Sequence, residues 1–547
     1  MQLFDIVLNN TGTSGWLTSA DELQIVIQSD KLNTVQPAIV KRLRPGDSAV
    51  VEVGVQNAAG VELGAIGPSI AVAQWSNDQS ASLEFNATYG IPSYSATPGS
   101  VNVHESPDWF RGAKYGIFIH WGVYSVPAYG NTNNNESYAE WYWNHQMNPN
   151  DKTMTYQYHL NKYGANFLYD DFIANFTVEN WNPKDWVDLF ADAGARYFVP
   201  TTKHHEGFAL FNMPSNVSNR NSVQQVPYRD LIKELFEAAK TYQPELRRGT
   251  YFSLPEWYNP AYSNYSDGTF GMGPPRNPYT NEVVPYTGFV EVDDFLTGIQ
   301  LPQMSILAYD YETDIMWCDI GGPSLSDEFA APWLNYALQQ NRQVTFNDRC
   351  GQVNGVQIVG DYATPEYAST TKLSPKHWEA CRGMDPFSFG YNYQTPDSEY
   401  MNATAIVTTL VDIVSKNGNF LLDIGPRSDG IIADIMQTNL RVAGQWIKAH
   451  HESIFDTKYW PNGPGSGNFR YTVTDDSFYI HYLAKPNGLL KVPDAVPYLS
   501  GDNVTVVGGF KDGSVVDSEL DGDNLVLDIP DNIASADNYT WTFKITY

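Results

Sequence analysis

The stretch that decides the fold is Thr313–Gly322, which reads TDIMWCDIGG. It predicts a short buried strand that runs into a glycine turn, with Asp319 at the point where the strand stops. A carboxylate at the outer end of a buried strand contributes little to stability. It is well placed for chemistry, because catalytic side chains in a barrel of parallel strands come from the carboxyl ends of the strands. Asp319 is therefore the candidate catalytic residue, provided that the rest of the chain builds such a barrel.

Short apolar runs alternate with amphipathic stretches on both sides of Asp319, between residues 104 and 455, which is the pattern of βα units. The strand candidates are Tyr115–His120, Arg196–Thr201, Gly249–Leu254, Ile315–Asp319, Gln343–Asn347, Phe387–Gly390 and Asn419–Ile424. The helix candidates include Pro183–Ala191, Arg229–Tyr242, Glu328–Asn341, Ala403–Ser415 and Met436–His450. We predict an α/β fold whose catalytic domain, residues 104–455, is a (β/α)8-like barrel, irregular or one strand short.

The two ends of the chain have a different pattern. Residues 1–103 and 456–547 contain alternating apolar runs such as Val50–Val55 and Phe478–Leu483, separated by turn residues. We predict an N-terminal β-sandwich-like accessory domain and a C-terminal β-sandwich domain. The segment Asp517–Gly522 faintly resembles a calcium loop, but its flanks are strand-like, so we interpret it as a hairpin.

Composition narrows the class of protein. The chain has 547 residues, 42% hydrophobic and 17% charged, with a net charge of -29 and a pI near 4.6. Its length indicates several domains, and its negative charge excludes nucleic acid and anionic membranes as partners. The sequence contains no apolar run of membrane-spanning length and shows no signal peptide, so we expect neither a membrane segment nor a leader in this chain.

Sequons favour a secreted, extracellular glycoprotein. Acceptor sites of the form N-x-Ser/Thr lie at Asn9, Asn86, Asn135, Asn175, Asn216, Asn264, Asn402, Asn503 and Asn538. The cysteines are too few for a disulfide scaffold. We expect Cys318 to face away from Asp319 and to pack as a small apolar residue, and the sequence leaves open whether Cys350 and Cys381 are bonded.

Polar residues gather at the ends of the predicted strands. His120, the pair His204 and His205, and Arg349 each follow an apolar run, as Asp319 does. Such strand ends converge on one mouth of a barrel, which favours a site. The histidines do not form the H-E-x-x-H helix motif, and adjacent strand residues point apart. We therefore predict hydrogen bonds to substrate hydroxyls and no metal.

Several separate motifs carry a family resemblance. They are Lys114–Gly122 (KYGIFIHWG), Glu140–Tyr142 (EWY), Lys203–Phe208 (KHHEGF), Trp317–Asp319 (WCD), Asn347–Arg349 (NDR) and Gly418–Pro426 (GNFLLDIGP). In this order they resemble the α-L-fucosidases of glycoside hydrolase family 29. The resemblance implies a retaining exo-α-L-fucosidase that removes terminal α-L-fucose through a covalent fucosyl-enzyme. Asp319, two residues after Trp317, matches the nucleophile of the family.

The resemblance leaves two candidates for the acid/base. Glu366 stands where many members carry it, and Glu379 also lies in a family-like motif. We favour Glu366, since a loop residue can reach over the mouth of the barrel. Glu379 is then a partly buried acid at the barrel rim.

The remaining site residues are carried over from the family position by position, and the resemblance implies a fucosylated oligosaccharide or polysaccharide as the partner. The residues expected to bind the sugar hydroxyls or to lie near the nucleophile are His120, Glu140, Trp141, His204, His205, Tyr251 and Arg349. Phe118, Trp317 and Phe389 are expected to form an apolar wall for the methyl group of fucose. No cofactor is implied. Two other readings stay open at this point: a fucose-binding module without catalysis, and a different retaining glycosidase such as an α-galactosidase-like enzyme. The fucosyl linkage also stays open.

Overall fold

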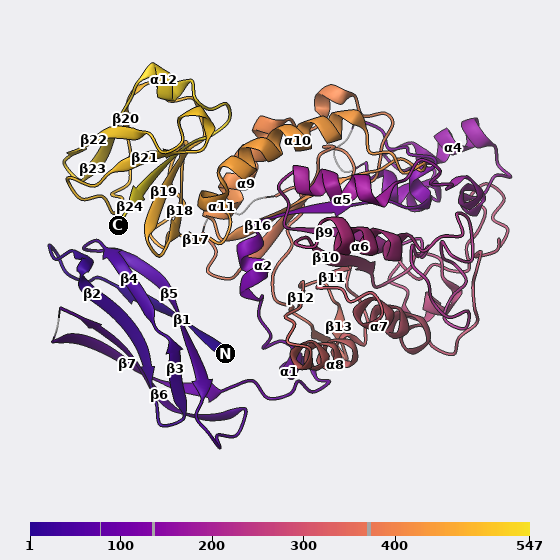
Figure 1. Ribbon diagram of the computed structural model, residues 1–547. Coiled ribbons are helices and arrows are strands. Elements are labelled where there is room, and N and C mark those ends of the chain that lie inside the picture. Colours follow the sequence, from indigo (N-terminus) through magenta and orange to yellow (C-terminus); the bar gives the residue numbers. More distant parts are fainter. Residues whose placement is uncertain (77, 134–136, 369–372) are drawn as a thin grey trace.

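The computed structural model describes residues 1–76, 78–133, 137–368 and 373–547. Figure 1 shows three regions: an N-terminal β region, a central α/β region and a C-terminal β region. The central region carries the site. The other two regions pack against each other and against the central region on the side away from α4 (Thr155–Tyr163).

The central region is built on a parallel sheet. Its strands in spatial order are β12 (Thr345–Phe346), β11 (Ile315–Asp319), β10 (Arg247–Ser253), β9 (Tyr197–Lys203), β8 (Tyr115–Ile119), β16 (Gly418–Ile424) and β15 (Trp378–Gly383). All the paired strands in this sheet run parallel. The parallel α/β arrangement confirms this part of the predicted fold.

Alternation along β11 separates the two faces of the sheet. Ile315 and Trp317 belong to the cluster enclosed by the strands, whereas Met316 and Cys318 belong to the layer shared with the helices. This is the two-residue period of a strand, and it places Asp319 on the same inner face as Trp317.

An irregular segment lies between the two ends of the sheet. Tyr362 forms a parallel bridge with Asn347, which follows β12, and Ala363 forms one with Trp378 of β15. Glu366 forms a further bridge with Cys381. This segment holds Glu366 beside β15.

One predicted strand is wrong, and the strand β15 was missed. Residues 387–390 are not a strand, because the Ser388 hydroxyl and the Gly390 N–H donate to Glu140 instead of to a neighbouring strand. The strand β15 was missed because Glu379 and Arg382 interrupt the run of apolar residues that predicts a buried strand. Glu379 is tolerated there because two buried side chains donate hydrogen bonds to it.

Helices cover the outer face of the sheet (Figure 1). The longer ones are α5 (Pro183–Asp192), α6 (Leu231–Tyr242), α7 (Leu301–Tyr309), α8 (Ser326–Gln339), α9 (Ala403–Ser415) and α10 (Asp434–Ala449). Several begin as the sequence predicts: α5 has Pro183 at its first turn, and the Asn182 side chain accepts from the Lys184 N–H. Shorter helical segments are α1 (Pro98–Val101), α2 (Asp108–Ala113), α3 (Tyr142–Gln146), α11 (His451–Ile454) and α12 (Asp531–Ala534).

The N-terminal region consists of two antiparallel sheets. One has the order β1 (Gln2–Asn9), β5 (Ser48–Asn57), β3 (Leu32–Gln36). The other has the order β4 (Ala38–Leu43), β2 (Leu17–Gln28), β6 (Ala65–Trp75), β7 (Gln79–Tyr89). Side chains from both sheets, among them Ile25 of β2 and Val53 of β5, share one core.

The C-terminal region is a connected antiparallel sheet. Its order is β17 (Lys458–Tyr459), β18 (Phe469–Thr474), β19 (Ser477–Tyr482), β24 (Trp541–Thr546), β21 (Val504–Val507), β22 (Val515–Asp521), β23 (Asn524–Ile529) and β20 (Gly488–Lys491). Strands from both ends of this order contribute to one core, so the sheet wraps around it. The expected hairpin at Asp517–Gly522 is confirmed, because β22 pairs with β23 directly across the turn.

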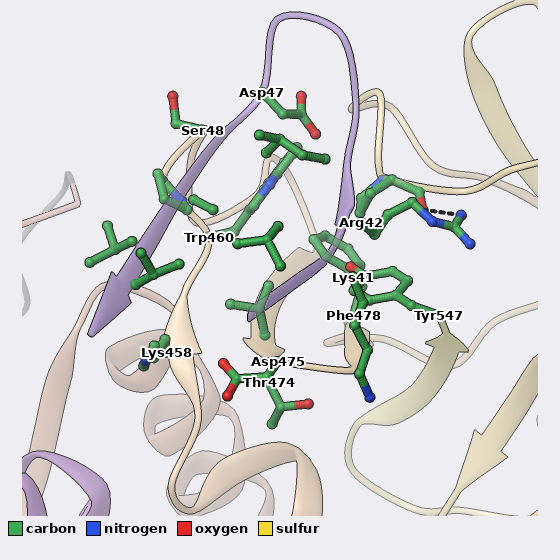
Figure 2. Close-up of a pocket in the computed structure, with 18 of the residues that line it drawn as sticks. Lys41, Arg42, Asp47, Ser48, Lys458, Trp460, Thr474, Asp475, Phe478 and Tyr547 are labelled. Carbon is green, nitrogen blue, oxygen red and sulfur yellow. Dashed lines mark hydrogen bonds between the residues drawn. The ribbon is translucent and has the colours of Figure 1, made fainter. Parts of the chain in front are cut away.

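The two β regions meet along a polar contact. Arg42 of β4 donates to both carboxylate oxygens of Asp502, at 2.7 and 3.2 Å, and its guanidinium lies 5.0 Å from the ring of Tyr547. Figure 2 shows the pocket beside this contact, about 590 Å³ in volume, with Trp460 and Phe478 in its wall. Charged pairs also hold the N-terminal region to the central region, as between Arg111 and Glu52 at 3.0 Å.

The cysteine expectations need correction. Cys318 does face away from Asp319, but it forms a disulfide with Cys350 rather than packing as a free residue. Cys381 is therefore not bonded to Cys350; it is a free, buried thiol on the inner face of β15. The sequence did not reveal this pairing because the partners are brought together by neighbouring strand ends, β11 and β12, that are remote in the chain.

Candidate active site

A cavity of about 430 Å³ opens at the carboxyl ends of the parallel strands. Its lining residues are Phe118, His120, Tyr138, Glu140, Trp141, His204, His205, Tyr251, Trp317, Asp319, Ile320, Glu366, Cys381 and Phe389. All the site residues expected from the sequence line this cavity except Arg349, which instead contacts both Asp319 and Glu366. The sequence analysis did not single out Tyr138, Ile320 and Cys381.

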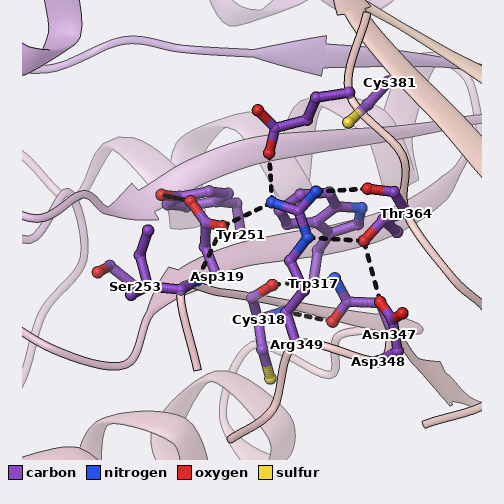
Figure 3. Close-up of polar contacts among 12 residues, drawn as sticks. Tyr251, Ser253, Trp317, Cys318, Asp319, Asn347, Asp348, Arg349, Thr364 and Cys381 are labelled. Carbon is purple, nitrogen blue, oxygen red and sulfur yellow. Dashed lines mark hydrogen bonds and ion pairs between the residues drawn. The ribbon is translucent and has the colours of Figure 1, made fainter. Parts of the chain in front are cut away.

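Asp319 is held by three donors at the end of β11 (Figure 3). The Tyr251 hydroxyl donates to Oδ2 at 2.6 Å, and the guanidinium of Arg349 donates to Oδ1 at 3.0 Å. The backbone N–H of Ile320 donates to Oδ1 at 2.8 Å, in a turn where Ile320 has a φ of 69°. These donors fix the orientation of the carboxylate, while Asp319 keeps 8% of its surface open to the cavity.

Arg349 connects Asp319 to Glu366. The same guanidinium nitrogen that donates to Asp319 also contacts Oε1 of Glu366. From behind, Thr364 accepts from Nε of Arg349 at 2.8 Å and fixes the plane of the guanidinium. Because both carboxylates contact one nitrogen, these two oxygens are no more than about 6 Å apart.

Each of the three site histidines has a polar partner on Nδ1, away from the cavity. His120 lies 2.7 Å from Oδ1 of Asp423, and His204 lies 3.3 Å from Oε2 of Glu206. The bond with Asp423 fixes the orientation of the His120 ring and leaves its Nε2 for the ligand, whereas the approach of His204 to Glu206 is close but forms no hydrogen bond. Asp423 and Glu206 belong to the motifs GNFLLDIGP and KHHEGF, but the sequence analysis gave them no role.

The tautomer of His205 follows from its contacts. Its Nδ1 lies 2.7 Å from the hydroxyl of Ser253, and that hydroxyl donates its only proton to the Pro255 carbonyl at 2.8 Å. Nδ1 must therefore carry the proton, which makes Nε2 an acceptor. Burial, with the nearby His204, lowers the pKa of His205 well below its ordinary value, so the ring is neutral. Nε2 lies 3.8 Å from Oδ2 of Asp319.

Glu140 and Trp141 form another part of the cavity wall. One carboxylate oxygen of Glu140 accepts from the Ser388 hydroxyl at 2.9 Å and from the Gly390 N–H at 2.8 Å. Burial raises the pKa of Glu140, and His204 opposes that shift. Trp141 meets the ring of His205 edge-on, with centroids 5.3 Å apart.

Three aromatic side chains make one side of the cavity apolar. The ring of Phe118 lies 4.9 Å from Trp317 and 6.3 Å from Phe389, measured between centroids. Phe389 also lies 4.9 Å from His120. A small apolar group beside polar substituents would fit this corner.

Glu379 lies behind Trp317 and does not line the cavity. It is fully buried, and the indole N–H of Trp317 donates to its Oε1 at 2.8 Å. The Tyr197 hydroxyl donates to its other oxygen. Burial raises the pKa of Glu379 to about 7, against the effect of these donors. The expectation of a partly buried acid at the barrel rim is therefore wrong in its burial, because Glu379 is fully enclosed near the start of β15.

Within the described ranges, no group of three or more His, Cys, Asp or Glu side chains is arranged to hold a metal ion. None of the helices in the same ranges is long and apolar enough to cross a membrane.

A parallel α/β fold with two carboxylates in one polar and aromatic cavity is the arrangement expected of a glycoside hydrolase. The comparisons with known proteins give the family. A family model described as Alpha-L-fucosidase matches residues 83–452. The alpha-L-fucosidase of Dictyostelium discoideum is 32% identical over 470 residues, which cover 83% of this chain and 95% of that protein. The chain belongs to the alpha-L-fucosidase family.

Other relatives agree. The tissue alpha-L-fucosidase of Homo sapiens is 32% identical over 458 residues, covering 82% of this chain and 90% of that protein. Among solved structures, the Thermotoga maritima alpha-fucosidase is 30% identical with a TM-score of 0.67, covering 83% of this chain and all of that one. The same Thermotoga enzyme has also been solved in complex with fucose.

Proposed function

We propose that this protein is a retaining exo-α-L-fucosidase in which Asp319 is the nucleophile and Glu366 is the acid/base. Asp319 attacks the anomeric carbon of a terminal fucose, and the protonated Glu366 gives its proton to the leaving oxygen. Water then attacks the fucosyl-enzyme, with Glu366 taking a proton from it. These two steps account for every bond and proton, so the reaction needs no cofactor.

The contact of Arg349 with both carboxylates is the observation that carries this proposal. Retaining enzymes hold their two carboxyl groups about 5–5.5 Å apart, whereas inverting enzymes hold them at about 6.5–9.5 Å to admit a water molecule. A shared guanidinium nitrogen supports the shorter range. Glu366 lines the cavity and Glu379 does not, which supports Glu366 as the acid/base.

The rest of the cavity suits a deoxy sugar. His120, His204 and Glu140 present polar atoms to hydroxyl groups, and a hydroxyl lost from the ligand would leave such a buried group unpaired. The corner formed by Phe118, Trp317 and Phe389 suits the methyl group of fucose. Burying that methyl is worth roughly 1 kcal/mol, enough to favour fucose over galactose without excluding it.

The Asp319→Gly variant tests the proposal. It should lose turnover of an aryl α-L-fucoside, because no carboxylate remains to form the glycosyl-enzyme. Azide, which can enter the space left by the side chain, should restore part of the rate and yield a fucosyl azide. Turnover like that of the wild type without azide would refute the assignment.

We also propose that the protein acts outside the cell. All the sequon asparagines in the described ranges are exposed, and Asn135 lies outside those ranges. A structural disulfide favours an oxidising compartment. Treatment of the natively produced protein with an N-glycosidase tests this: a fall in mass is expected, and an unchanged mass would contradict it.

For the architecture, we propose that the parallel sheet is an irregular barrel closed through residues 361–366, with a β-sandwich before it and another after it. The bridges of Tyr362 and Ala363 to opposite ends of the sheet support the closure. The shared core of the two N-terminal sheets supports the first sandwich. The domain bounds 1–103, 104–455 and 456–547 belong to this proposal.

A further inference from the structure

The disulfide Cys318–Cys350 lies directly beside the reacting groups. Cys318 precedes Asp319 in the chain, and Cys350 follows Arg349. Both sulfurs lie on the outer face of the sheet, among buried side chains, while Asp319 and Arg349 meet on the inner side. The covalent bond thus joins the backbones that carry these two functional residues.

A second link joins the same two segments (Figure 3). The side chain of Asn347 accepts from the Cys318 N–H at 2.9 Å and donates to the Cys318 carbonyl at 2.9 Å. Asn347 and Cys350 therefore both bind Cys318, one through its backbone and one through its sulfur. Arg349 lies between these two anchor points in the chain.

We propose that Cys318 and Cys350 are positioning residues for catalysis: their disulfide sets the place of the Arg349 guanidinium between Asp319 and Glu366. This inference rests on the function proposed above. The guanidinium must contact two carboxylates at once, and a shift of its backbone by about 1 Å would break one contact or the other. Asn347 anchors the start of the segment to β11, and the disulfide is the tie to β11 at its end, since the backbone bonds of Gln352 go to Gly322 and Ser324, beyond that strand.

The segment should keep its course without the disulfide. The carbonyl of Cys350 accepts from the Ser324 hydroxyl at 3.1 Å and from the Ser326 hydroxyl at 2.5 Å, at the start of α8. These bonds tie Cys350 to α8 rather than to β11. A variant without the disulfide is therefore expected to fold and to lose chiefly the coupling between Arg349 and Asp319.

A double-mutant cycle tests the proposal. Four proteins are compared by their kcat and KM on an aryl α-L-fucoside: the wild type, Cys318→Ala/Cys350→Ala, Arg349→Ala, and the combination of all three substitutions. Loss of the disulfide should lower kcat roughly 10- to 100-fold with a small change in KM. In the Arg349→Ala background the same loss should cost less than about threefold, because the guanidinium that the disulfide places is already absent.

Met316→Ala is the matched control. Met316 is a buried residue on the same outer face of β11 and lies in the same packing layer as the disulfide, but it is not one of the bonded cysteines. It should lower the unfolding temperature and leave kcat within about twofold of the wild type. A similar fall in kcat for Met316→Ala would show that general destabilisation explains the effect, and it would overturn the proposal.

Two further outcomes would overturn it. One is an equal fall in kcat on removing the disulfide in both backgrounds, and the other is an unchanged kcat in the folded Cys318→Ala/Cys350→Ala variant.

If that variant does not fold, the wild type is reduced below its unfolding temperature, and the reduced fraction of the pair is measured by mass spectrometry. Activity should fall in proportion and return on reoxidation; full activity in reduced protein would overturn the proposal. The Asp319→Gly variant is measured in parallel. If it is inactive while one of these results is found, the proposed function stands and only the role of the disulfide is refuted.

Discussion

Exchanging each of two glutamates for glutamine should separate the acid/base from its rival. Glu366 lines the cavity and contacts Arg349, whereas Glu379 lies fully buried behind Trp317. Glu366→Gln removes the proton that the leaving oxygen needs. Glu379→Gln keeps an acceptor for the Trp317 N–H and supplies an N–H₂ group to the Tyr197 oxygen, which imitates the protonated acid.

The magnitude follows from the role. General acid catalysis typically contributes 10²–10⁴-fold, or about 3–5 kcal/mol of the barrier. A substrate with a sugar leaving group should therefore lose about that much kcat/KM in Glu366→Gln. An aryl fucoside whose phenolate leaves without a proton should lose less than about tenfold in the same step. Glu379→Gln should stay within about threefold of the wild type on both substrates at acidic pH, since it neither touches substrate nor carries the proton.

The assay measures kcat/KM for each variant on a fucosylated oligosaccharide and on aryl fucosides of graded leaving-group pKa. A steep dependence on leaving-group pKa in Glu366→Gln and a flat one in Glu379→Gln are expected. The opposite result, with the steep dependence in Glu379→Gln, would refute the assignment and would require Trp317 to move aside during the reaction.

Three other predictions concern the supports of the site. Tyr251→Phe removes a donor 2.6 Å from Asp319. A charge-assisted bond is worth about 1.5–3 kcal/mol, so kcat/KM on an aryl fucoside should fall roughly 10- to 100-fold. An unchanged kcat/KM would exclude a role for this bond. Glu379 has its pKa raised from 4.5 to about 7 by burial. Its protonated form is favoured in the folded state, so the stability it contributes is full below its unfolded pKa near 4.5 and is lost as the pH rises through about 7. The free energy of unfolding, measured by urea titration, should fall by up to roughly 3 kcal/mol over this window in the wild type and less in Glu379→Gln; equal slopes would contradict this origin. The disulfide closes a sequence separation of 32 residues, so Cys318→Ala/Cys350→Ala should lower the free energy of unfolding by about 3–4 kcal/mol. An unchanged free energy of unfolding would show that the unfolded chain is already restricted between these positions without the disulfide.

The strand ends could be predicted because their patterns are local. The apolar run Ile315–Asp319 is the strand β11 in the structure. His204 directly follows β9, as the apolar run before it predicts. Chain order and the geometry of parallel strands then bring such residues to one mouth. The family resemblance indicated most of the residues that line it, but not Tyr138, Ile320 or Cys381.

Contacts between distant segments could not be predicted in the same way. Asp423 resembles an ordinary strand acid until the fold places it against His120, which lies about 300 residues earlier in the chain. The same reason explains the disulfide, since nothing in the sequence around Cys318 distinguishes Cys350 from Cys381 as its partner. The mistaken strand at 387–390 arose because its aromatic pattern was taken as strand packing when its backbone binds Glu140.

Covalent trapping tests the central claim most directly. A 2-fluorinated fucosyl fluoride slows hydrolysis of a glycosyl-enzyme more than its formation, so the intermediate of a retaining enzyme accumulates. Mass spectrometry of the digested protein should then find one fucosyl adduct, on the peptide that contains Asp319. An adduct on another carboxylate, or release of fucose with inverted configuration and no adduct, would contradict the account.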